Sequence, residues 1–85
     1  MKTHELKIWP KWFDAVKNGT KTFEIRRDDR GVEVGDQIIF EEFRPGVGEY
    51  TGRTTERRVS YISRGDDAEA AGLKEGHCVI GLERP

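Results

Sequence analysis

The sequence predicts a single α+β domain in which about five β-strands form a small curved barrel, with one short helix packed on it. Three observations support this prediction. Short runs of alternating apolar residues recur along the chain, one stretch has the apolar spacing of a helix, and no linker divides the 85 residues. We therefore expect one domain over residues 1–85. Closing the sheet, fully or nearly, would also remove its exposed strand edges.

The first predicted strand covers residues 3–8, where polar and apolar side chains alternate. The alternation places His4, Leu6 and Ile8 on one face and Lys7 on the other. We expect the face that carries the apolar side chains to contribute to the core.

The predicted helix begins at Pro10, because a first helical turn does not need the N–H that proline lacks. Gly19 suits the left-handed conformation that ends many helices. Between them, large apolar side chains follow the spacing i, i+3, i+4 and i+7, at Trp9, Trp12, Phe13 and Val16. The helix is too short to be stable alone and must lie on the sheet. Two tryptophans could provide a base-stacking platform, but their helical spacing favours core packing for both.

The second predicted strand follows a turn and covers residues 22–25, which are rich in β-branched and aromatic side chains. Its apolar face should carry Phe23 and Ile25 into the core and leave Glu24 on the opposite face. Strict alternation also puts Lys21 on the face opposite Glu24. A shared site for these two side chains would therefore need a bulge or a twist.

The remaining strands are predicted at residues 37–43, 54–63 and 77–83. Residues 38–40 are apolar on both faces, which indicates a strand in the middle of the structure. The glycine-rich residues 44–52 predict a long hairpin loop, and residues 67–71 allow a short helical turn. Tyr61 is expected in the core and not at a catalytic site.

The composition limits the classes of function. Charged residues make up 36% of the chain, but the formal net charge is only -1. This balance argues against binding of nucleic acid by bulk positive charge, so any such contact must come from a local pocket.

The sequence predicts neither a metal site nor a cofactor. The single cysteine, Cys78, excludes an internal disulfide, and its apolar neighbours predict a buried, unreactive thiol. The two histidines lie far apart without the spacing of metal ligands. No apolar run approaches a membrane span and the first residues do not resemble a signal peptide, so we expect a cytoplasmic protein.

The densest group of ionisable side chains lies within residues 21–30. A solvated strand face with ordinary ion pairs would account for it. The same side chains could also recognise a ligand. Arg26 offers a rigid fork for a phosphate or a base edge, and Glu24 can accept a hydrogen bond from an exocyclic amine. Lys21 could contact a phosphate, or act as a base or nucleophile if burial lowered its pKa.

The pattern Gly19-x-Lys21-x-x-Glu24-x-Arg26 resembles the signature of the ASCH domains, which belong to the PUA-like superfamily. Residues 4–7, 21–26, 29–30, 34–36 and 72–73 extend the resemblance to a small phage and bacterial branch of unknown function. The similarity covers nearly the whole chain. One departure is Asp28, which stands where that branch has an asparagine.

The resemblance implies a PUA-like barrel with a charged cleft suited to RNA or a nucleotide-like small molecule. The ligand-binding residues that it suggests are Lys21, Glu24, Arg26, Asp29, Arg30, His4 and Lys7. For His4 and Lys7, an ordinary surface pair is an equally good interpretation. A few ASCH proteins hydrolyse the amide of acylated cytidine or cleave RNA, with the motif lysine implicated. If this chain is an enzyme, its catalytic residues would be Lys21 and Glu24.

We therefore expect an RNA- or nucleotide-binding domain, and two alternatives stay open. The first is a small hydrolase that acts on a modified nucleoside or RNA through Lys21. Against it, the amidohydrolases have a threonine where this chain has Glu24. The second is a phage or bacterial protein-interaction module. A ligand-sized cleft around Lys21 would favour the binding or hydrolase interpretations, and a flat surface would favour the interaction module.

Overall fold

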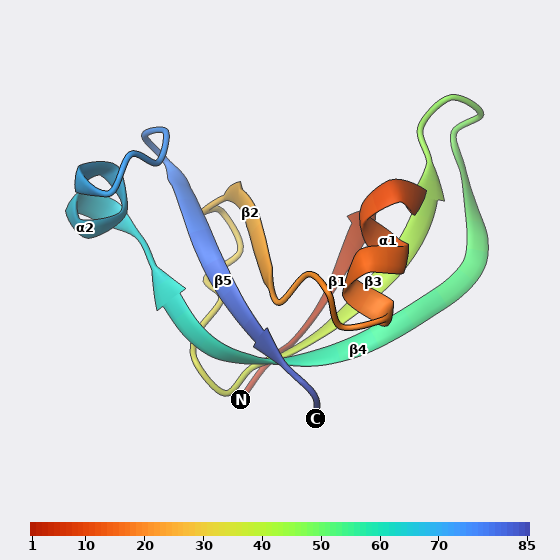
Figure 1. Ribbon diagram of the computed structural model, residues 1–85, viewed down its shortest axis with the longest axis horizontal. Coiled ribbons are helices and arrows are strands. Elements are labelled where there is room, and N and C mark those ends of the chain that lie inside the picture. Colours follow the sequence, from red (N-terminus) through yellow and green to blue (C-terminus); the bar gives the residue numbers. More distant parts are fainter.

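The computed structural model describes residues 1–85 and contains one sheet of five strands with two short helices (Figure 1). In chain order the elements are β1 (Thr3–Ile8), α1 (Pro10–Lys17), β2 (Phe23–Arg27), β3 (Gln37–Arg44), β4 (Glu49–Ser63), α2 (Gly65–Ala70) and β5 (His77–Glu83). The predicted α+β class is confirmed. The sequence predicted one helix and allowed a helical turn at residues 67–71; that turn is a second short helix, α2.

The strands follow the order β1-β3-β4-β5-β2. β1 pairs parallel to β3, and the other three pairs are antiparallel. The long strand β4 runs through both halves of the bent sheet, with β5 and β2 on one side and β3 and β1 on the other (Figure 1). β1 and β2 are the two edges and no backbone ladder joins them. The sheet is therefore not closed into the predicted barrel.

The core lies between the sheet and α1 and draws on every strand except β2. Its members are Leu6, Ile8, Phe13, Val16, Val32, Ile38, Phe40, Val59, Cys78, Ile80 and Leu82. In β1 the side chains of His4, Leu6 and Ile8 are buried and their neighbours are exposed, as the alternation predicted.

α1 begins at Pro10, and Gly19 just beyond it has φ +86°, as the sequence predicted. Phe13 and Val16 are buried. The core positions predicted for the tryptophans were wrong, because Trp9 and Trp12 are 49% and 40% exposed. An eight-residue helix buries only a narrow stripe, and the two indole rings stack on each other at its margin, 5.2 Å apart.

The predicted orientation of β2 was also wrong. Phe23 and Ile25 are 43% and 47% exposed, whereas Glu24 is buried. The reason is the register with β5, where Glu24 lies opposite the buried Ile80 and Ile25 lies opposite Val79. In β5 the residues Cys78, Ile80 and Leu82 face the core. Because Glu24 pairs with Ile80, the charged face of β2 also points toward the core.

The region between β3 and β4 is more regular than the sequence predicted. Residues 44–52 are not a long loop, because β3 continues to Arg44, β4 begins at Glu49 and only a tight turn separates them. An edge-to-face contact between Phe43 and Tyr50, with ring centroids 5.1 Å apart, supports this extension. Tyr61 on β4 is 64% exposed, so its predicted place in the core was wrong.

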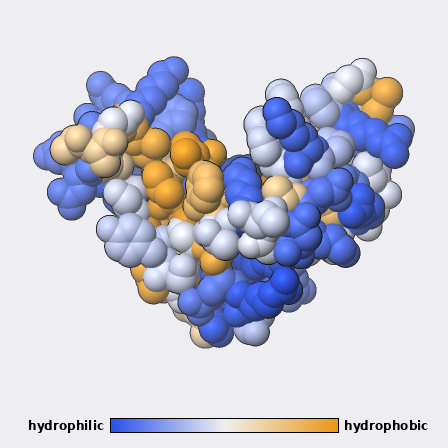
Figure 2. Space-filling model, viewed as in Figure 1, coloured by the Kyte–Doolittle hydropathy of each residue, from blue (hydrophilic) through white to orange (hydrophobic).

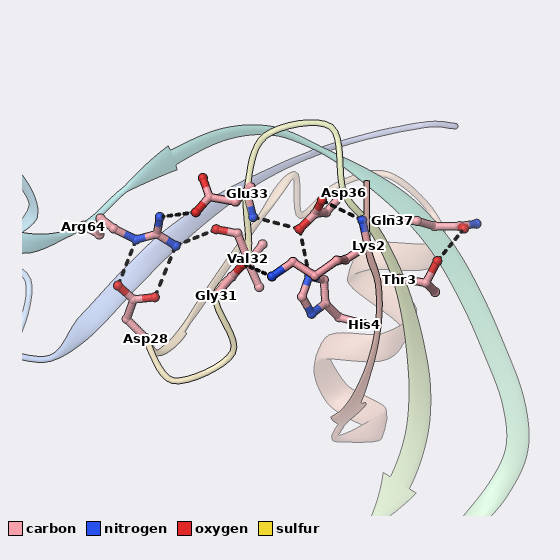
Figure 3. A network of polar contacts seen from close by, with 10 residues as sticks. All are labelled: Lys2, Thr3, His4, Asp28, Gly31, Val32, Glu33, Asp36, Gln37 and Arg64. Carbon is pink, nitrogen blue, oxygen red and sulfur yellow. Dashed lines mark hydrogen bonds and ion pairs between the residues drawn. The ribbon is translucent and has the colours of Figure 1, made fainter.

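A polar network holds the loop between β2 and β3 (Figure 3). The Asp36 carboxylate accepts hydrogen bonds from the backbone N–H groups of Lys2 and Glu33, and its Oδ2 lies 2.9 Å from His4 Nε2. These contacts hold the pKa of Asp36 well below its usual range. At the other end of the loop, Arg64 donates to Asp28 at 2.9 Å and to Glu33 at 3.3 Å.

Neither helix is long and apolar enough to cross a membrane. No group of three or more His, Cys, Asp and Glu side chains comes together in an arrangement that could hold a metal ion.

Candidate functional site

Two cationic side chains of the predicted motif contact the buried carboxylate of a third motif residue, Glu24. Lys21 Nζ lies 3.1 Å from Glu24 Oε1. Arg26 donates to Glu24 Oε2 through Nη2 at 2.9 Å and Nε at 3.2 Å. We call Lys21, Glu24 and Arg26 the charge cluster. A buried carboxylate is tolerated here because both of its oxygens accept charge-assisted hydrogen bonds.

Lys21 reaches Glu24 without the bulge that strict alternation required. β2 begins only at Phe23, so Lys21 lies in the turn that follows α1. In that turn the backbone N–H of Lys21 donates to the carbonyl of Ala15 at 2.9 Å. Because the turn and not the pleat of a strand sets its direction, the Lys21 side chain folds back to the face that carries Glu24.

Arg26 also links the two edges of the sheet. Its Nη2 donates to the backbone carbonyl of Lys7 on β1 at 2.9 Å. Arg30, in the loop after β2, lies 3.4 Å from the carbonyl of Glu5. Side chains thus span the gap where a closed barrel would have a backbone ladder.

The charge cluster borders a pocket of about 330 Å³, lined by Trp12, Lys21, Phe23, Glu24 and Ile25. We call it the aromatic pocket. Lys21 Nζ lies 5.4 Å from the ring centroid of Trp12 and 5.5 Å from that of Phe23. Figure 2 shows the molecule hollowed between two lobes, with apolar residues gathered on one wall of the hollow. Lys21 lines the aromatic pocket, so the surface around it is concave.

The aromatic pocket combines three chemical features. Exposed aromatic faces can stack on a planar ring, Glu24 can accept hydrogen bonds, and Lys21 supplies a positive charge. Apolar walls with a few convergent polar groups are typical of small-molecule sites. The arrangement suits a flat ligand that carries hydrogen-bond donors.

The other predicted site residues do not join the charge cluster. His4 is buried against Asp36, so it holds the polar network instead of lining the pocket. Lys7 contacts the charge cluster only through its backbone carbonyl, which accepts a hydrogen bond from Arg26. Its ammonium lies 4.5 Å from the centroid of the Phe43 ring. Asp29 is exposed in a loose pair with Arg30, at 3.8 Å.

Asp28 stands where the phage and bacterial branch has an asparagine, and it forms an ion pair with Arg64. Its carboxylate accepts two hydrogen bonds from Arg64, at 2.9 and 3.3 Å, and helps to raise the pKa of that guanidinium. An asparagine could not form this ion pair. Cys78 is buried as predicted, and burial raises the pKa of its thiol. This thiol therefore lacks the character of a nucleophile.

The aromatic and apolar walls of the site were not predicted, because Trp12, Phe23 and Ile25 were expected in the core. One signal could have found them. A helix of about two turns has too little buried surface for Trp9 and Trp12 beside Phe13 and Val16. The surplus aromatic side chains next to a charged motif could therefore have indicated a binding surface.

Comparison with known proteins shows the family to which this chain belongs and a solved structure with the same fold. Residues 3–82 match the family described as "Domain of unknown function (DUF3850)". Over 62 residues the chain is 42% identical to an "Uncharacterized 12.9 kDa protein in GpA 3'region" of Escherichia phage P2. That match covers 73% of this chain and 55% of the phage protein, so the chain spans about half the length of this relative.

The structure also resembles the crystal structure of hypothetical protein PH0355. The TM-score is 0.65, the sequence identity is 20%, and the match covers 98% of each chain. At this identity the likeness shows a shared fold.

Proposed function

Because this chain belongs to the DUF3850 family, a domain of unknown function, we propose a function from its own site: it binds a nucleobase of RNA, or of a nucleotide-like small molecule, in the aromatic pocket. On this proposal the chain is an ASCH domain of the PUA-like class, as the pattern Gly19-x-Lys21-x-x-Glu24-x-Arg26 suggests. The site has two parts, a stacking surface and a hydrogen-bonding carboxylate.

The observation that carries the proposal is a buried carboxylate at the edge of a pocket with exposed aromatic walls. Burial of Glu24 between two cations costs desolvation energy that an apolar side chain would not. Exposed Trp12 and Phe23 likewise contribute little to folding. Binding supplies a reason for both, since a carboxylate reads the exocyclic amine of cytosine and aromatic side chains stack on any base.

The pocket also fits such a ligand in size and charge. Its volume of about 330 Å³ is at the small end of the roughly 300–1,000 Å³ of small-molecule sites. The net charge of -1 favours recognition of one base in a pocket over a broad electrostatic grip on a duplex. A protein-interaction module would use a flatter surface than the concave one around Lys21.

The proposal predicts that the aromatic walls determine affinity. Trp12→Ala and Phe23→Ala should each weaken binding by about five- to a hundredfold, since stacking on an aromatic side chain contributes about 1–3 kcal/mol per base. Both side chains are substantially exposed, so the melting temperature should change little. Calorimetric titration with the four ribonucleosides and with short single-stranded RNAs measures the effect.

Tyr61→Ala is the matched control, because Tyr61 is an exposed aromatic residue on β4 that does not line the pocket. It should bind like the parent protein. Equal affinity in all three variants would mean that the ligand binds elsewhere. No binding of any nucleoside or RNA by the parent protein would contradict the proposal itself.

A second candidate is hydrolysis of a modified nucleoside through Lys21. The contact that favours it is the distance of 3.1 Å between Lys21 Nζ and Glu24 Oε1, in a lysine side chain that is only 18% exposed. This pair could pass a proton to a leaving amine. The nearby carboxylate stabilises the charged ammonium, however, whereas a nucleophile must be neutral. Binding is therefore the first proposal.

Lys21→Arg separates the two candidates. Arginine keeps the positive charge but serves neither as an amine nucleophile nor as a base. A binding domain should keep most of its affinity in this variant. A lysine-dependent hydrolase should still bind a cytidine acylated on its exocyclic amine, yet release the acyl group at least about a hundredfold more slowly. Chromatography of the released cytidine measures turnover, and full turnover in Lys21→Arg would exclude a chemical role for Lys21.

A further inference from the structure

A second, smaller pocket lies beside the aromatic pocket and shares Lys21 with it. Its volume is about 140 Å³, and its lining residues are Gly19, Lys21, Thr22, Arg57, Leu82, Glu83 and Arg84. We call it the basic pocket. Because Lys21 lines both pockets, the two are neighbours.

Arg57 brings a buried positive charge to the basic pocket without a carboxylate to balance it. The side chain belongs to a residue that is only 7% exposed. Its Nη2 donates to the carbonyls of Val16 and Lys17 at the end of α1, at 2.7 and 3.1 Å. Its Nη1 donates to the carbonyl of Glu56 at 2.5 Å and to Thr55 Oγ1 at 3.2 Å, which leaves Nε for a ligand. All of these acceptors are uncharged. Burial is the main reason why the pKa of Arg57 is lowered, and the nearby charge of Arg84 lowers it further.

Arg84 is the second cation, and it makes no hydrogen bond or ion pair within the protein. Its guanidinium lies close to the turn after α1, where a Cβ added at Gly19 would be 3.4 Å from Arg84 Nη2. The one carboxylate that lines the pocket, Glu83, is already paired with Arg58 at 2.6 Å. The basic pocket therefore holds two guanidinium groups and no free carboxylate.

We infer that the basic pocket binds a phosphate group between Arg57 and Arg84. An anion there would offset the charge of the two neighbouring cations. Arg84 offers a whole guanidinium fork, which matches the geometry of phosphate oxygens, and Arg57 offers its remaining Nε–H. The volume of about 140 Å³ is less than half that of the aromatic pocket, so it suits a phosphate better than a second base.

The inference names the ligand class of the proposed function and rests on that function. A base in the aromatic pocket would have its phosphate in the basic pocket, with Lys21 between them. The preferred ligand is then a nucleotide or an RNA phosphodiester and not a free nucleoside. The alternative role of Arg57, as a cap for the carbonyls of α1, leaves the position of Arg84 without an explanation.

Arg84→Ala tests the inference directly. Arg84 is exposed and makes no hydrogen bond or ion pair, so this variant should melt like the parent protein. Arg44→Ala is the matched control, because it removes the same charge from an exposed arginine at the β3 end that also lacks a side-chain partner. We would titrate each protein by calorimetry with the four ribonucleosides, with their monophosphates and with inorganic phosphate, at low and high ionic strength. Backbone amide shifts of Gly19 and Thr22 would locate the bound phosphate.

We expect the parent protein to bind a monophosphate about ten- to a hundredfold more tightly than its nucleoside, the scale of one or two charge-assisted hydrogen bonds. Arg84→Ala should lose most of this gain, Arg44→Ala should keep it, and added salt should reduce it. Inorganic phosphate should shift the amide signals of Gly19 and Thr22.

Each failure has a distinct signature. Nucleoside binding with no gain from the phosphate, or a gain that Arg84→Ala retains, would overturn the phosphate site and leave the proposed function intact. Phosphate binding at Gly19 and Thr22 without any nucleoside or nucleotide binding would overturn the proposed function and the nucleotide assignment with it.

Discussion

At the scale of single residues, charged side chains fix positions that apolar packing leaves open. Glu24 and Asp36 are both buried carboxylates, and each is satisfied by several donors. Glu24 is surrounded by two cations beside an open pocket, whereas Asp36 accepts backbone N–H groups and contacts His4 inside the fold. The first arrangement leaves its partners accessible to a ligand, and the second holds the chain together.

Asp36 should make the stability of the protein sensitive to acid. Its pKa lies below the ordinary value of 3.8 in the folded state, so folding releases protons and is favoured where the carboxylate is ionised. The stabilisation is fully present above about pH 5 and declines as the pH falls below about 4 towards the lower pKa of the folded state.

Asp36→Asn should therefore cost about 1–3 kcal/mol in the free energy of unfolding near pH 7, the scale of lost hydrogen bonds to a charged group. The difference from the parent protein should narrow as the pH falls below about 4. Urea titration across this range measures it, with Asp29→Asn as the control for an exposed aspartate. A constant difference at all pH values would mean that the ionisation of Asp36 does not stabilise the fold.

At the scale of elements, some apolar side chains of α1 pack in the core and others remain exposed beside the candidate site. Phe13 and Val16 anchor the helix in the core, and Trp9 and Trp12 remain at its margin. Arg53 on β4 adds a second attachment, since its guanidinium lies 4.6 Å from the Phe13 ring centroid and pairs with Asp14 at 3.0 Å. These contacts hold α1 on the sheet, and α1 in turn positions Trp12 in the wall of the aromatic pocket.

Two neighbouring substitutions in α1 should lower the stability of the protein by very different amounts. Phe13→Ala should cost about 3–5 kcal/mol of stability, because it empties a fully buried aromatic site. Trp12→Ala, one residue earlier, should stay within about 1 kcal/mol of the parent protein. Chemical denaturation of both variants measures this contrast. Similar losses for the two would show that Trp12 packs as part of the core.

At the scale of the whole molecule, an open sheet is held by side chains across its gap. Arg26 and Arg30 donate to the carbonyls of Lys7 and Glu5 on the opposite edge. An exposed strand edge invites pairing with other chains, and these contacts occupy part of the β1 edge. The same Arg26 belongs to the charge cluster, so one side chain takes part both in the link between the sheet edges and in the candidate site.

Arg26→Ala should loosen the edge formed by β2. It removes two hydrogen bonds to Glu24 and one to β1, which should cost about 2 kcal/mol or more because a buried carboxylate loses a partner. Amide hydrogen exchange should quicken in β1 and β2 while β3 and β4 stay protected.

Arg27→Ala is the control for this change, since Arg27 is the next residue, exposed and without a side-chain partner. It should leave both stability and exchange unchanged. If Arg26→Ala exchanges at the same rates as Arg27→Ala, the side-chain link does not hold the two edges together.

Much of the local structure could be predicted from the sequence, because it depends on residues close together in the chain. The alternation in β1 identified its buried face, Pro10 and Gly19 marked the ends of α1, and the apolar neighbours of Cys78 predicted its burial. The motif residues Lys21, Glu24 and Arg26 were also identified, because their chemistry stands out within a short stretch.

The tertiary structure alone decided which face of each element became the site. Pairing with β5 turned Glu24 inward and Phe23 outward, against the apolar pattern of β2 itself. Bending of the sheet without closure brought Arg26 to the carbonyl of Lys7. The end of the chain brought Arg84 beside Arg57. Each of these contacts joins segments that are far apart in the sequence, so the local pattern of apolar residues cannot predict it. Strand register and sheet curvature are set by the packing of the whole domain.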